Sequence, residues 1–187
     1  MFTIFKMPSF TISNIGIFST IYTNDAAGGV TRLLNIGIEP FLLASSVEAF
    51  IAQRLVRVIC PKCKVEDTDS RDLKKQIMKD IAQFAKLNKR KDVQELARLK
   101  EEDIHLYKGK GCEECNNTGY RDRTAIYEIL KANRPVRDLI LEKASSDDIR
   151  EEAIKQGMRT LRMAGWKKVI EGVTTPSEVF RVTQAEE

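Results

Sequence analysis

Ile-Cys-Pro-Lys-Cys-Lys (59–64) and Gly-Cys-Glu-Glu-Cys-Asn (111–116) hold all four cysteines of this 187-residue chain. Two residues separate the cysteines of each pair, so one tight turn can aim two thiolates at a single point. Two such turns supply the four soft ligands of a tetrahedral zinc site, and the glycines at 109, 111 and 119 permit close turns. Lysines beside the pairs offset the negative charge of four thiolates. The pattern predicts a structural zinc site formed by Cys60, Cys63, Cys112 and Cys115.

Three other interpretations of the cysteines are two redox dithiols, two disulfides or four unrelated thiols. A redox Cys-x-x-Cys opens a helix beside a strand, and neither pair does so clearly. The N-terminal run 1–10 is a poor match to a secretory signal, since it has a single lysine and an interrupting proline. Paired Cys-x-x-Cys motifs in a reducing compartment favour metal over disulfides. Structural zinc is therefore the preferred hypothesis.

The two cysteine pairs lie unusually far apart, with residues 64 to 111 between them. A compact zinc ribbon places its pairs roughly 15–20 residues apart, so we expect an inserted segment that folds back on itself. This segment is rich in charge and carries apolar residues at helical spacing. They are Leu73, Ile77, Ile81 and Phe84, and then Val93, Leu96 and Ala97. The pattern predicts a helical hairpin with a solvated outer face.

The residues before the first pair predict a short strand and two helices. The strand covers 15–21, and we expect it at an exposed sheet edge. The first helix covers 25–35, capped by Thr23 or Asn24 and ended by Gly37. The second begins at Ser45, which stands at capping-box spacing from Glu48. Its apolar side is formed by Val47, Ile51, Leu55 and Val58, and its exposed side by Glu48, Arg54 and Arg57.

The residues after the second pair predict a strand at 124–130 followed by helices. These helices cover 135–143, 145–157 and 161–171, and a short last helix opens at Thr175-Pro-Ser-Glu178 with a capping box and a proline at its first position. We expect Trp166 in the core of this helical part.

Charge and hydropathy exclude some classes of protein. The 31 basic and 27 acidic residues give a net charge of +4 and are interleaved over most of the chain. Only the short run 86–91 is basic, so we expect no nucleic-acid partner. No stretch approaches the roughly 18 consecutive apolar residues of a membrane span.

Several segments, in order, resemble the C-terminal part of the secretion ATPases of the type II secretion and type IV pilus assembly group. The matching segments are Phe-Ser-Thr-Ile-Tyr-Thr-Asn-Asp-Ala-Ala-Gly-Gly (18–29), Gly-Ile-Glu-Pro-Phe-Leu-Leu-Ala-Ser-Ser-Val (37–47), Ala-Gln-Arg-Leu-Val-Arg (52–57), both cysteine pairs, Gly-Tyr-Arg-Asp-Arg-Thr-Ala-Ile-Tyr-Glu-Ile-Leu (119–130), Gly-Met-Arg-Thr-Leu (157–161) and Gly-Val-Thr-Thr-Pro-Ser-Glu-Val (172–179). The resemblance covers roughly residues 14–183, and residues 1–13 match nothing.

The resemblance implies a mostly α fold with a small β component. It implies a remnant of a RecA-like ATPase core over 1–58, a four-cysteine zinc subdomain over 59–131 with a helical insertion at 65–108, and a helical subdomain over 132–187. Members of the family assemble as cytoplasmic hexamers on the inner membrane and use ATP to drive assembly of pilus-like fibres. The implied partners are homologous ATPase subunits and inner-membrane platform proteins of the machine.

Departures from the family pattern bear on catalysis. ATP hydrolysis needs a phosphate-cradling Gly-x-x-x-x-Gly-Lys-Ser/Thr loop and acidic magnesium ligands. The loop occurs nowhere in this chain, and the family's acidic motifs lie upstream of where the sequence starts. Tyr22 stands where the family has a histidine near the nucleotide phosphates, and Asp122 stands where it has a glycine. Thr20 and Tyr22 would then lie near ATP and Mg²⁺ only in an intact family protein.

The resulting hypothesis is a non-hydrolysing fragment or paralogue of a secretion ATPase, with structural zinc and no catalytic residue of its own. A freestanding zinc-ribbon adaptor that binds protein or nucleic acid is the alternative, and a thiol oxidoreductase is a third. His105, the only histidine, lies in the insertion and is expected on the surface.

Overall fold

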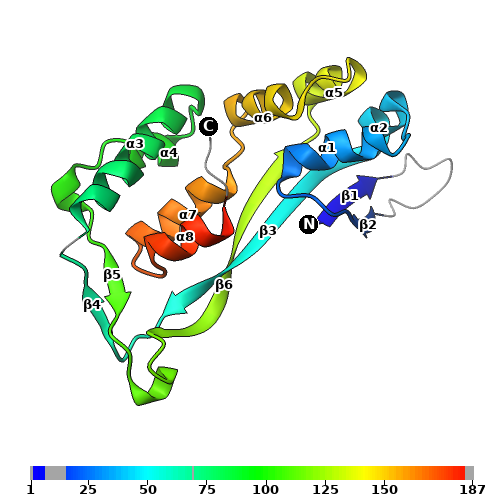
Figure 1. Cartoon of the computed structure of the whole chain (residues 1–187). Helices are drawn as coiled ribbons and strands as arrows, with labels where there is room; N and C mark the ends of the chain where they lie inside the picture. The colour runs from blue at the N-terminus through cyan, green and yellow to red at the C-terminus, as the bar shows by residue number, and fades with distance from the viewer. Residues whose placement is uncertain (1, 7–15, 69, 184–187) are drawn as a thin grey trace. The chain divides into compact units, whose positions relative to one another are not determined.

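The computed structural model describes residues 2–6, 16–68 and 70–183, with side chains described from residue 18 onward. Helices hold more of the described residues than strands do, in line with the mostly α prediction. The helices are α1 (Ala26–Asn35), α2 (Pro40–Ser46), α3 (Arg71–Leu87), α4 (Lys91–Leu96), α5 (Arg134–Leu141), α6 (Ser146–Lys155), α7 (Leu161–Ile170) and α8 (Pro176–Val182), with 3₁₀ turns η1 (Glu101–Asp103) and η2 (Glu113–Cys115). The strands are β1 (Phe2–Lys6), β2 (Gly16–Thr20), β3 (Val47–Ile59), β4 (Lys64–Glu66), β5 (Tyr107–Gly109) and β6 (Tyr120–Lys131), as Figure 1 labels them.

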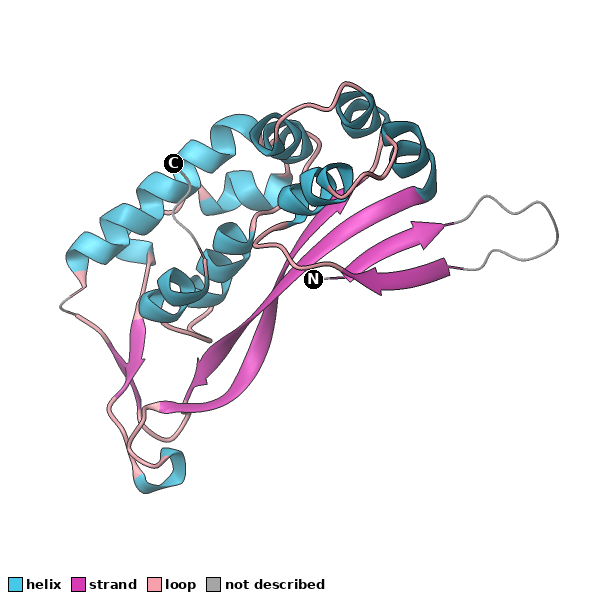
Figure 2. Ribbon diagram, turned by 45° about the vertical axis from the view of Figure 1, so that its right-hand side comes forward, coloured by secondary structure: helices cyan, strands magenta, loops and turns pink. Residues whose placement is uncertain are grey.

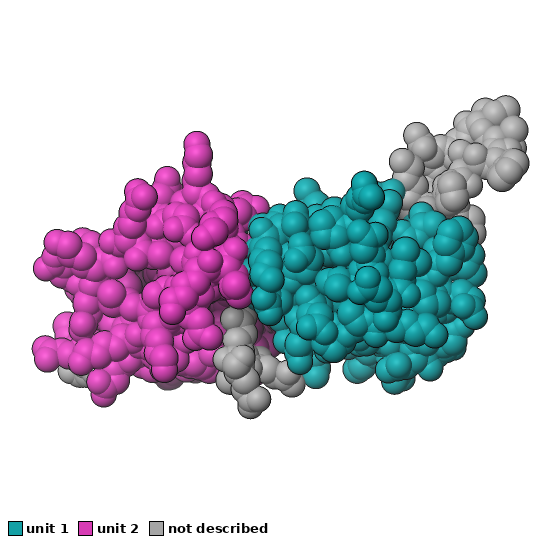
Figure 3. All heavy atoms as spheres, turned by 90° about the horizontal axis from the view of Figure 1, so that it is seen from above, with its two compact units in different colours: residues 1–53, 127–160 teal, residues 54–126, 161–187 magenta. Residues whose placement is uncertain are grey.

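The chain divides into two compact units, and each unit is built from two separate stretches of sequence. Unit 1 comprises residues 1–53 and 127–160, and unit 2 comprises residues 54–126 and 161–187 (Figure 3). The long strands β3 and β6 contribute one part to each unit. Unit 1 therefore holds α1, α2, α5 and α6, whereas unit 2 holds α3, α4, α7 and α8.

The larger sheet has the strand order β2-β1-β3-β6. β1 pairs antiparallel with β2, from Phe2 opposite Thr20 to Lys6 opposite Gly16, and on its other side with β3. β2 therefore lies at an edge, as the sequence predicts, although Ile15 is outside the described residues. β1 is the unexpected element, because the sequence patterns predict no strand or helix before residue 15.

The helix predicted to begin at Ser45 is wrong, because β3 is a 13-residue strand. The helix in this region is α2, which begins with a proline and ends just where the other was expected to start. Ser45 caps no helix, since its hydroxyl donates back to the carbonyl oxygen of Phe41 at 2.8 Å. Along β3, Ala52 and Val56 are buried, whereas Leu55, which the helix prediction placed on the apolar side, is 46% exposed. Apolar residues at helical spacing were thus also compatible with a strand of period two.

Unit 1 is organised around the N-terminus of α1. Asp25 is the N-cap residue, in place of the predicted Thr23 or Asn24, and its Oδ1 accepts the Gly28 N–H at 2.7 Å. Its Oδ2 binds Arg150 of α6 at 2.6 Å, and Glu128 Oε1 of β6 accepts the Ala26 N–H at 2.8 Å. α1 packs against α6, and α2 against α5. The fully buried side chains include Ala26, Ala27, Val30, Val47, Phe50, Leu130, Val136, Ile140 and Ile149.

Unit 2 has its core where the inserted helices meet the C-terminal ones. Two helices, α3 and α4, occupy the segment predicted as a helical hairpin, and α3 packs against α7. Trp166 is fully buried, as expected, and its indole N–H donates to Asp80 Oδ2 of α3 at 3.1 Å. Its ring meets Phe180 edge-on at 5.1 Å. The buried residues of the predicted stripes are Ile77, Ile81, Phe84 and Val93.

Figure 2 distinguishes helices from strands by colour, and the two short strands β4 and β5 form a separate two-stranded sheet. Within the described part of the chain, no helix has the length and apolar character needed to cross a membrane.

Candidate metal centre

Two backbone ladders in unit 2 bring the distant cysteine pairs together. Lys64, directly after the first pair, stands opposite Gly109, just before the second, at the end of the antiparallel β4–β5 ladder. The Lys110 N–H donates to the Cys63 carbonyl at 3.0 Å, and on the other side the Cys60 N–H donates to the Gly119 carbonyl at 3.0 Å. The inserted segment is therefore a loop closed at its base by β4 and β5. This closure explains how pairs so far apart in sequence meet.

The four sulfur atoms form a compact cluster, which we call the cysteine cluster. Their Sγ atoms all lie within 4.8 Å of one another. The Sγ–Sγ distances are 3.8 Å for Cys60–Cys112, 3.9 Å for Cys63–Cys115 and 3.6 Å for Cys112–Cys115. A tetrahedron with metal–sulfur bonds of about 2.3 Å has edges of about 3.8 Å. The four thiols thus have the separation that a tetrahedral tetrathiolate site requires, and none is at the roughly 2.05 Å of a disulfide.

Backbone groups around the second pair orient its sulfurs. Cys115 Sγ accepts the Cys112 N–H at 3.2 Å and the Gly119 N–H at 3.3 Å. The turn continues through Asn116 and Asn117, both left-handed with φ of 49° and 58°. A Cβ on Gly109 would collide with the backbone of Gly119, so the close approach of these two strands requires glycine.

The same N–H groups change the acidity of the thiols. Burial by itself raises the pKa of the Cys115 thiol, but the Cys112 and Gly119 N–H donors outweigh it and lower that pKa to about 6. Burial raises the pKa of Cys63 to about 12, and hydrogen bonding with the neighbouring thiols adds to this. The two thiols thus differ in acidity, with Cys115 the more readily ionised and Cys63 the less.

The two lysines beside the first cysteine pair contact groups other than the thiols. Lys62 pairs with Glu114 at 3.7 Å. Lys64 Nζ donates to the Gly172 carbonyl at 2.7 Å and lies 4.2 Å from the Tyr107 ring centroid. Among the described residues, neither ammonium group forms a hydrogen bond or ion pair with a cysteine.

Asp122 adopts a left-handed backbone conformation with φ of 68°. This conformation costs little for glycine but roughly 1 kcal/mol for other residues. It is the position where the resemblance indicates a glycine, so the backbone after the second pair carries this strain.

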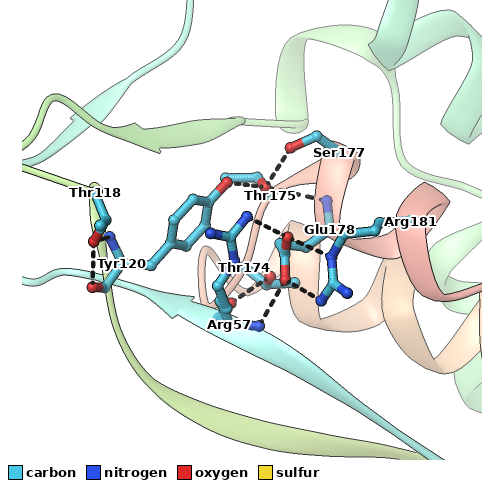
Figure 4. Close-up of polar contacts among 8 residues, drawn as sticks. All are labelled: Arg57, Thr118, Tyr120, Thr174, Thr175, Ser177, Glu178 and Arg181. Carbon is cyan, nitrogen blue, oxygen red and sulfur yellow. Dashed lines mark hydrogen bonds and ion pairs between the residues drawn. The ribbon is translucent and has the colours of Figure 1, made fainter.

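A second polar cluster of unit 2 was not predicted from the sequence (Figure 4). Glu178, at the start of α8, is 1% exposed, and its carboxylate accepts four hydrogen bonds. Oε1 accepts from Arg57 Nη2 at 2.7 Å and Arg181 Nε at 2.9 Å, and Oε2 from the Arg57 N–H at 3.0 Å and Arg181 Nη2 at 2.8 Å. The Arg57 guanidinium stacks on the Tyr120 ring at 4.1 Å, and the Tyr120 hydroxyl lies 2.8 Å from Thr175 Oγ1. We call these five residues the Glu178 cluster.

The arginines determine the charge state of Glu178. Burial by itself raises the pKa of this carboxyl, but hydrogen bonds from Arg181 and Arg57 hold it at about 2. The predicted capping box is half present: Thr175 Oγ1 accepts the Glu178 N–H at 3.4 Å, while the carboxylate turns to the arginines. Arg57 and Glu178 are 121 residues apart, so no local spacing could have indicated the pair.

The remaining candidate residues lie on the surface. Thr20 ends β2 and is exposed, and Tyr22 is fully exposed. His105 is also largely exposed, with its Nδ1 2.7 Å from Glu66 Oε1. The structure thus gathers the four predicted metal ligands, whereas Thr20 and Tyr22 belong to unit 1 and are not part of that cluster.

Comparison with known proteins establishes the family. The sequence model of the Type II/IV secretion system protein family matches residues 15–181. The chain is 38% identical over 163 residues to the type IV pilus assembly ATPase PilB of Myxococcus xanthus, a match that covers 87% of this chain and 26% of the relative. It is 41% identical to the type II secretion system protein E of Pseudomonas aeruginosa, covering 91% of this chain and 30% of the relative. It is 36% identical to the type II secretion system ATPase E of Vibrio cholerae, covering 90% and 29%.

This chain therefore belongs to the Type II/IV secretion system protein family, as the sequence segments predict. It spans between 26% and 30% of the length of these three curated relatives. The cysteine cluster and the Glu178 cluster both lie within the matched residues.

Proposed function

We propose that this chain is the C-terminal part of a secretion or pilus assembly ATPase, in which Cys60, Cys63, Cys112 and Cys115 hold one structural zinc ion. The carrying observation is the arrangement of four thiols at tetrahedral spacing on two turns closed by backbone ladders. When bound, the metal supplies the positive charge that four thiolates need and ties the two turns together. The cysteines are ligands here and take part in no reaction, since four thiolate ligands close a zinc site to substrate.

This chain lacks a sequence motif that ATP hydrolysis requires. No phosphate-binding loop occurs in the 187 residues, and we propose that this chain alone does not hydrolyse ATP. Thr20 and Tyr22 would approach ATP and Mg²⁺ only beside the phosphate-binding half of a complete family protein. A remnant of the RecA-like core over 1–58, a zinc subdomain over 59–131 and a helical subdomain over 132–187 remain the proposed organisation.

The proposed partners are homologous ATPase subunits and inner-membrane platform proteins, with the chain in the cytoplasm at the membrane face and a hexamer as the assembled form. These roles follow from the family resemblance, and the family itself is supported by relatives that are a type IV pilus assembly ATPase and a type II secretion system ATPase.

Metal content and turnover test this proposal together. We expect inductively coupled plasma mass spectrometry to find about one zinc per purified chain, and to find that zinc lost in Cys112→Ser. We also expect no release of phosphate from ATP by the purified chain. Retention of zinc by Cys112→Ser would reject the ligand set. ATP turnover by the pure chain would reject the second part of the proposal and leave the zinc site unaffected.

A further inference from the structure

The Glu178 cluster borders a hollow whose polar lining is entirely cationic. The hollow has a volume of about 530 Å³ and is lined by Leu55, Arg57, Arg123 and Arg181, all within unit 2. Leu55 and Arg57 are two residues apart on β3, so their side chains leave the same face of the sheet. Arg123 comes from β6 and Arg181 from α8.

Glu178 does not neutralise these arginines. Its two oxygens already accept four hydrogen bonds, two each, so the carboxylate is saturated and faces the arginines that hold it. One negative charge against three guanidinium groups leaves a net charge of +2 at the hollow. Arg123 is exposed, and its side chain has no hydrogen bond or ion pair with another residue in the described part of the chain. Arg57 and Arg181 keep further N–H donors beyond those that Glu178 uses, and their side chains are 43% and 55% exposed.

The carboxylate and the stacked tyrosine also fix the arginines in place. Arg57 is held from one side by Glu178 and from another by the Tyr120 ring, and Arg181 is held by two parallel hydrogen bonds. A guanidinium fixed in this way loses less conformational entropy on binding an oxyanion. The Glu178 cluster therefore presents guanidinium groups in fixed positions at the hollow.

We infer that this hollow, defined by Leu55, Arg57, Arg123 and Arg181, binds an acidic segment of a partner protein. Carboxylates match the forked geometry of guanidinium groups. The half-exposed Leu55 adds an apolar wall that inorganic phosphate would not use, and a side chain beside the carboxylates would cover it. A single phosphate would also fill only a small part of the volume. The inference goes beyond the proposed function, because it names a surface and the chemistry of its partner, and it holds whichever metal the cysteines bind.

The test uses the metal-loaded full chain and a fluorescein-labelled peptide in which leucines interrupt a run of glutamates. The control peptide has the same sequence with every glutamate replaced by glutamine. Measured by fluorescence anisotropy, the acidic peptide should bind and the glutamine peptide should not. The affinity for the acidic peptide should fall as the salt concentration rises. Arg123→Gln should weaken it about tenfold and Arg123→Lys less, because lysine keeps the charge and loses the fork. Leu55→Thr should weaken peptide binding about threefold. Arg98→Gln is the matched control, since Arg98 is an exposed arginine of unit 2 that does not line the hollow.

Arg123→Gln is chosen because Arg123 takes no part in the Glu178 hydrogen bonds, and its thermal unfolding should match that of the wild type. Absence of binding, or equal losses in Arg123→Gln and Arg98→Gln, would overturn the inference. Tighter binding of linear polyphosphate of equal charge would assign the hollow to phosphate instead. Self-association that Arg123→Gln abolishes, measured by sedimentation, would assign it to a second copy of the chain.

Discussion

The cysteine cluster and the Glu178 cluster, both in unit 2, differ in how their negative charge is balanced. Each gathers groups that carry, or can take, a negative charge at a site that is at least partly buried. Glu178 meets two guanidinium groups of its own chain, and its carboxylate is fully hydrogen-bonded. Near the cysteines, Lys62 binds Glu114 and Lys64 binds the Gly172 carbonyl instead of the thiols. The Glu178 cluster is complete as the chain folds, whereas we propose that the cysteine cluster needs a bound metal ion.

The two clusters therefore differ in what holds them together. The Glu178 cluster connects the end of β3, α8 and Tyr120 of β6 by direct hydrogen bonds and stacking. The cysteine turns are joined by short ladders and otherwise by the proposed metal. Perturbing the metal should affect one cluster and spare the other, and perturbing Glu178 should do the reverse.

Loss of the metal should have the largest effect. Structural zinc contributes roughly 10 kcal/mol or more to the folding of small zinc modules, so we expect chelation or Cys112→Ser to release the turns at 59–66 and 107–119. Hydrogen exchange of the amides in these two segments should rise by roughly a hundredfold or more. Glu113→Gln, between the same two cysteines, should leave exchange unchanged. Equal protection with and without metal would show that the ladders suffice.

Glu178→Gln should have the next largest effect. The substitution removes the charge while keeping the shape, and leaves two arginines facing an amide. We expect a loss of roughly 3 kcal/mol in the free energy of unfolding, measured in urea on the metal-loaded chain. Zinc content should stay the same, which separates this cluster from the other. Glu95→Gln, on the exposed side of α4, is the control and should change stability by less than about 0.5 kcal/mol.

The pH dependence of that difference sharpens the comparison. The pKa of Glu178 is about 2 in the folded chain against an ordinary 4.5. Its stabilisation is therefore fully present above about pH 5 and is lost as the pH falls toward 2. The gap in stability between wild type and Glu178→Gln should shrink over this range. Any loss of metal on acidification should affect both proteins equally and cancel in this difference. A difference in stability that stays constant down to pH 2 would therefore contradict the low pKa of Glu178.

Asp122→Gly should give the smallest effect, and it is stabilising. Glycine removes the strain of φ 68° but loosens the unfolded chain, and the net gain should be about 0.5 kcal/mol. The gain should appear in thermal unfolding with the metal bound. A loss of stability would mean that the Asp122 side chain contributes more than its backbone costs.

Local spacing explains which parts of the molecule could be predicted from sequence. The two Cys-x-x-Cys turns, the inserted helices and the helices after residue 133 all follow from patterns within a few residues. The sequence predicts a helix in the stretch that forms β3, because the apolar residues there fit both the helical and the strand period. Only pairing with β1 and β6 decides between them. The contacts of Glu178 could not be predicted, because they join residues 121 positions apart. The capping box that the sequence predicts accounts for the hydrogen bond of the Glu178 N–H but not for those of its carboxylate.

The central claim is that one metal ion, bound by all four cysteines, completes the cysteine cluster. X-ray absorption at the zinc edge of the purified chain tests it most directly. We predict four sulfur neighbours at about 2.3 Å and no nitrogen or oxygen ligand. Fewer than four sulfur neighbours, or no bound zinc at all, would contradict the account.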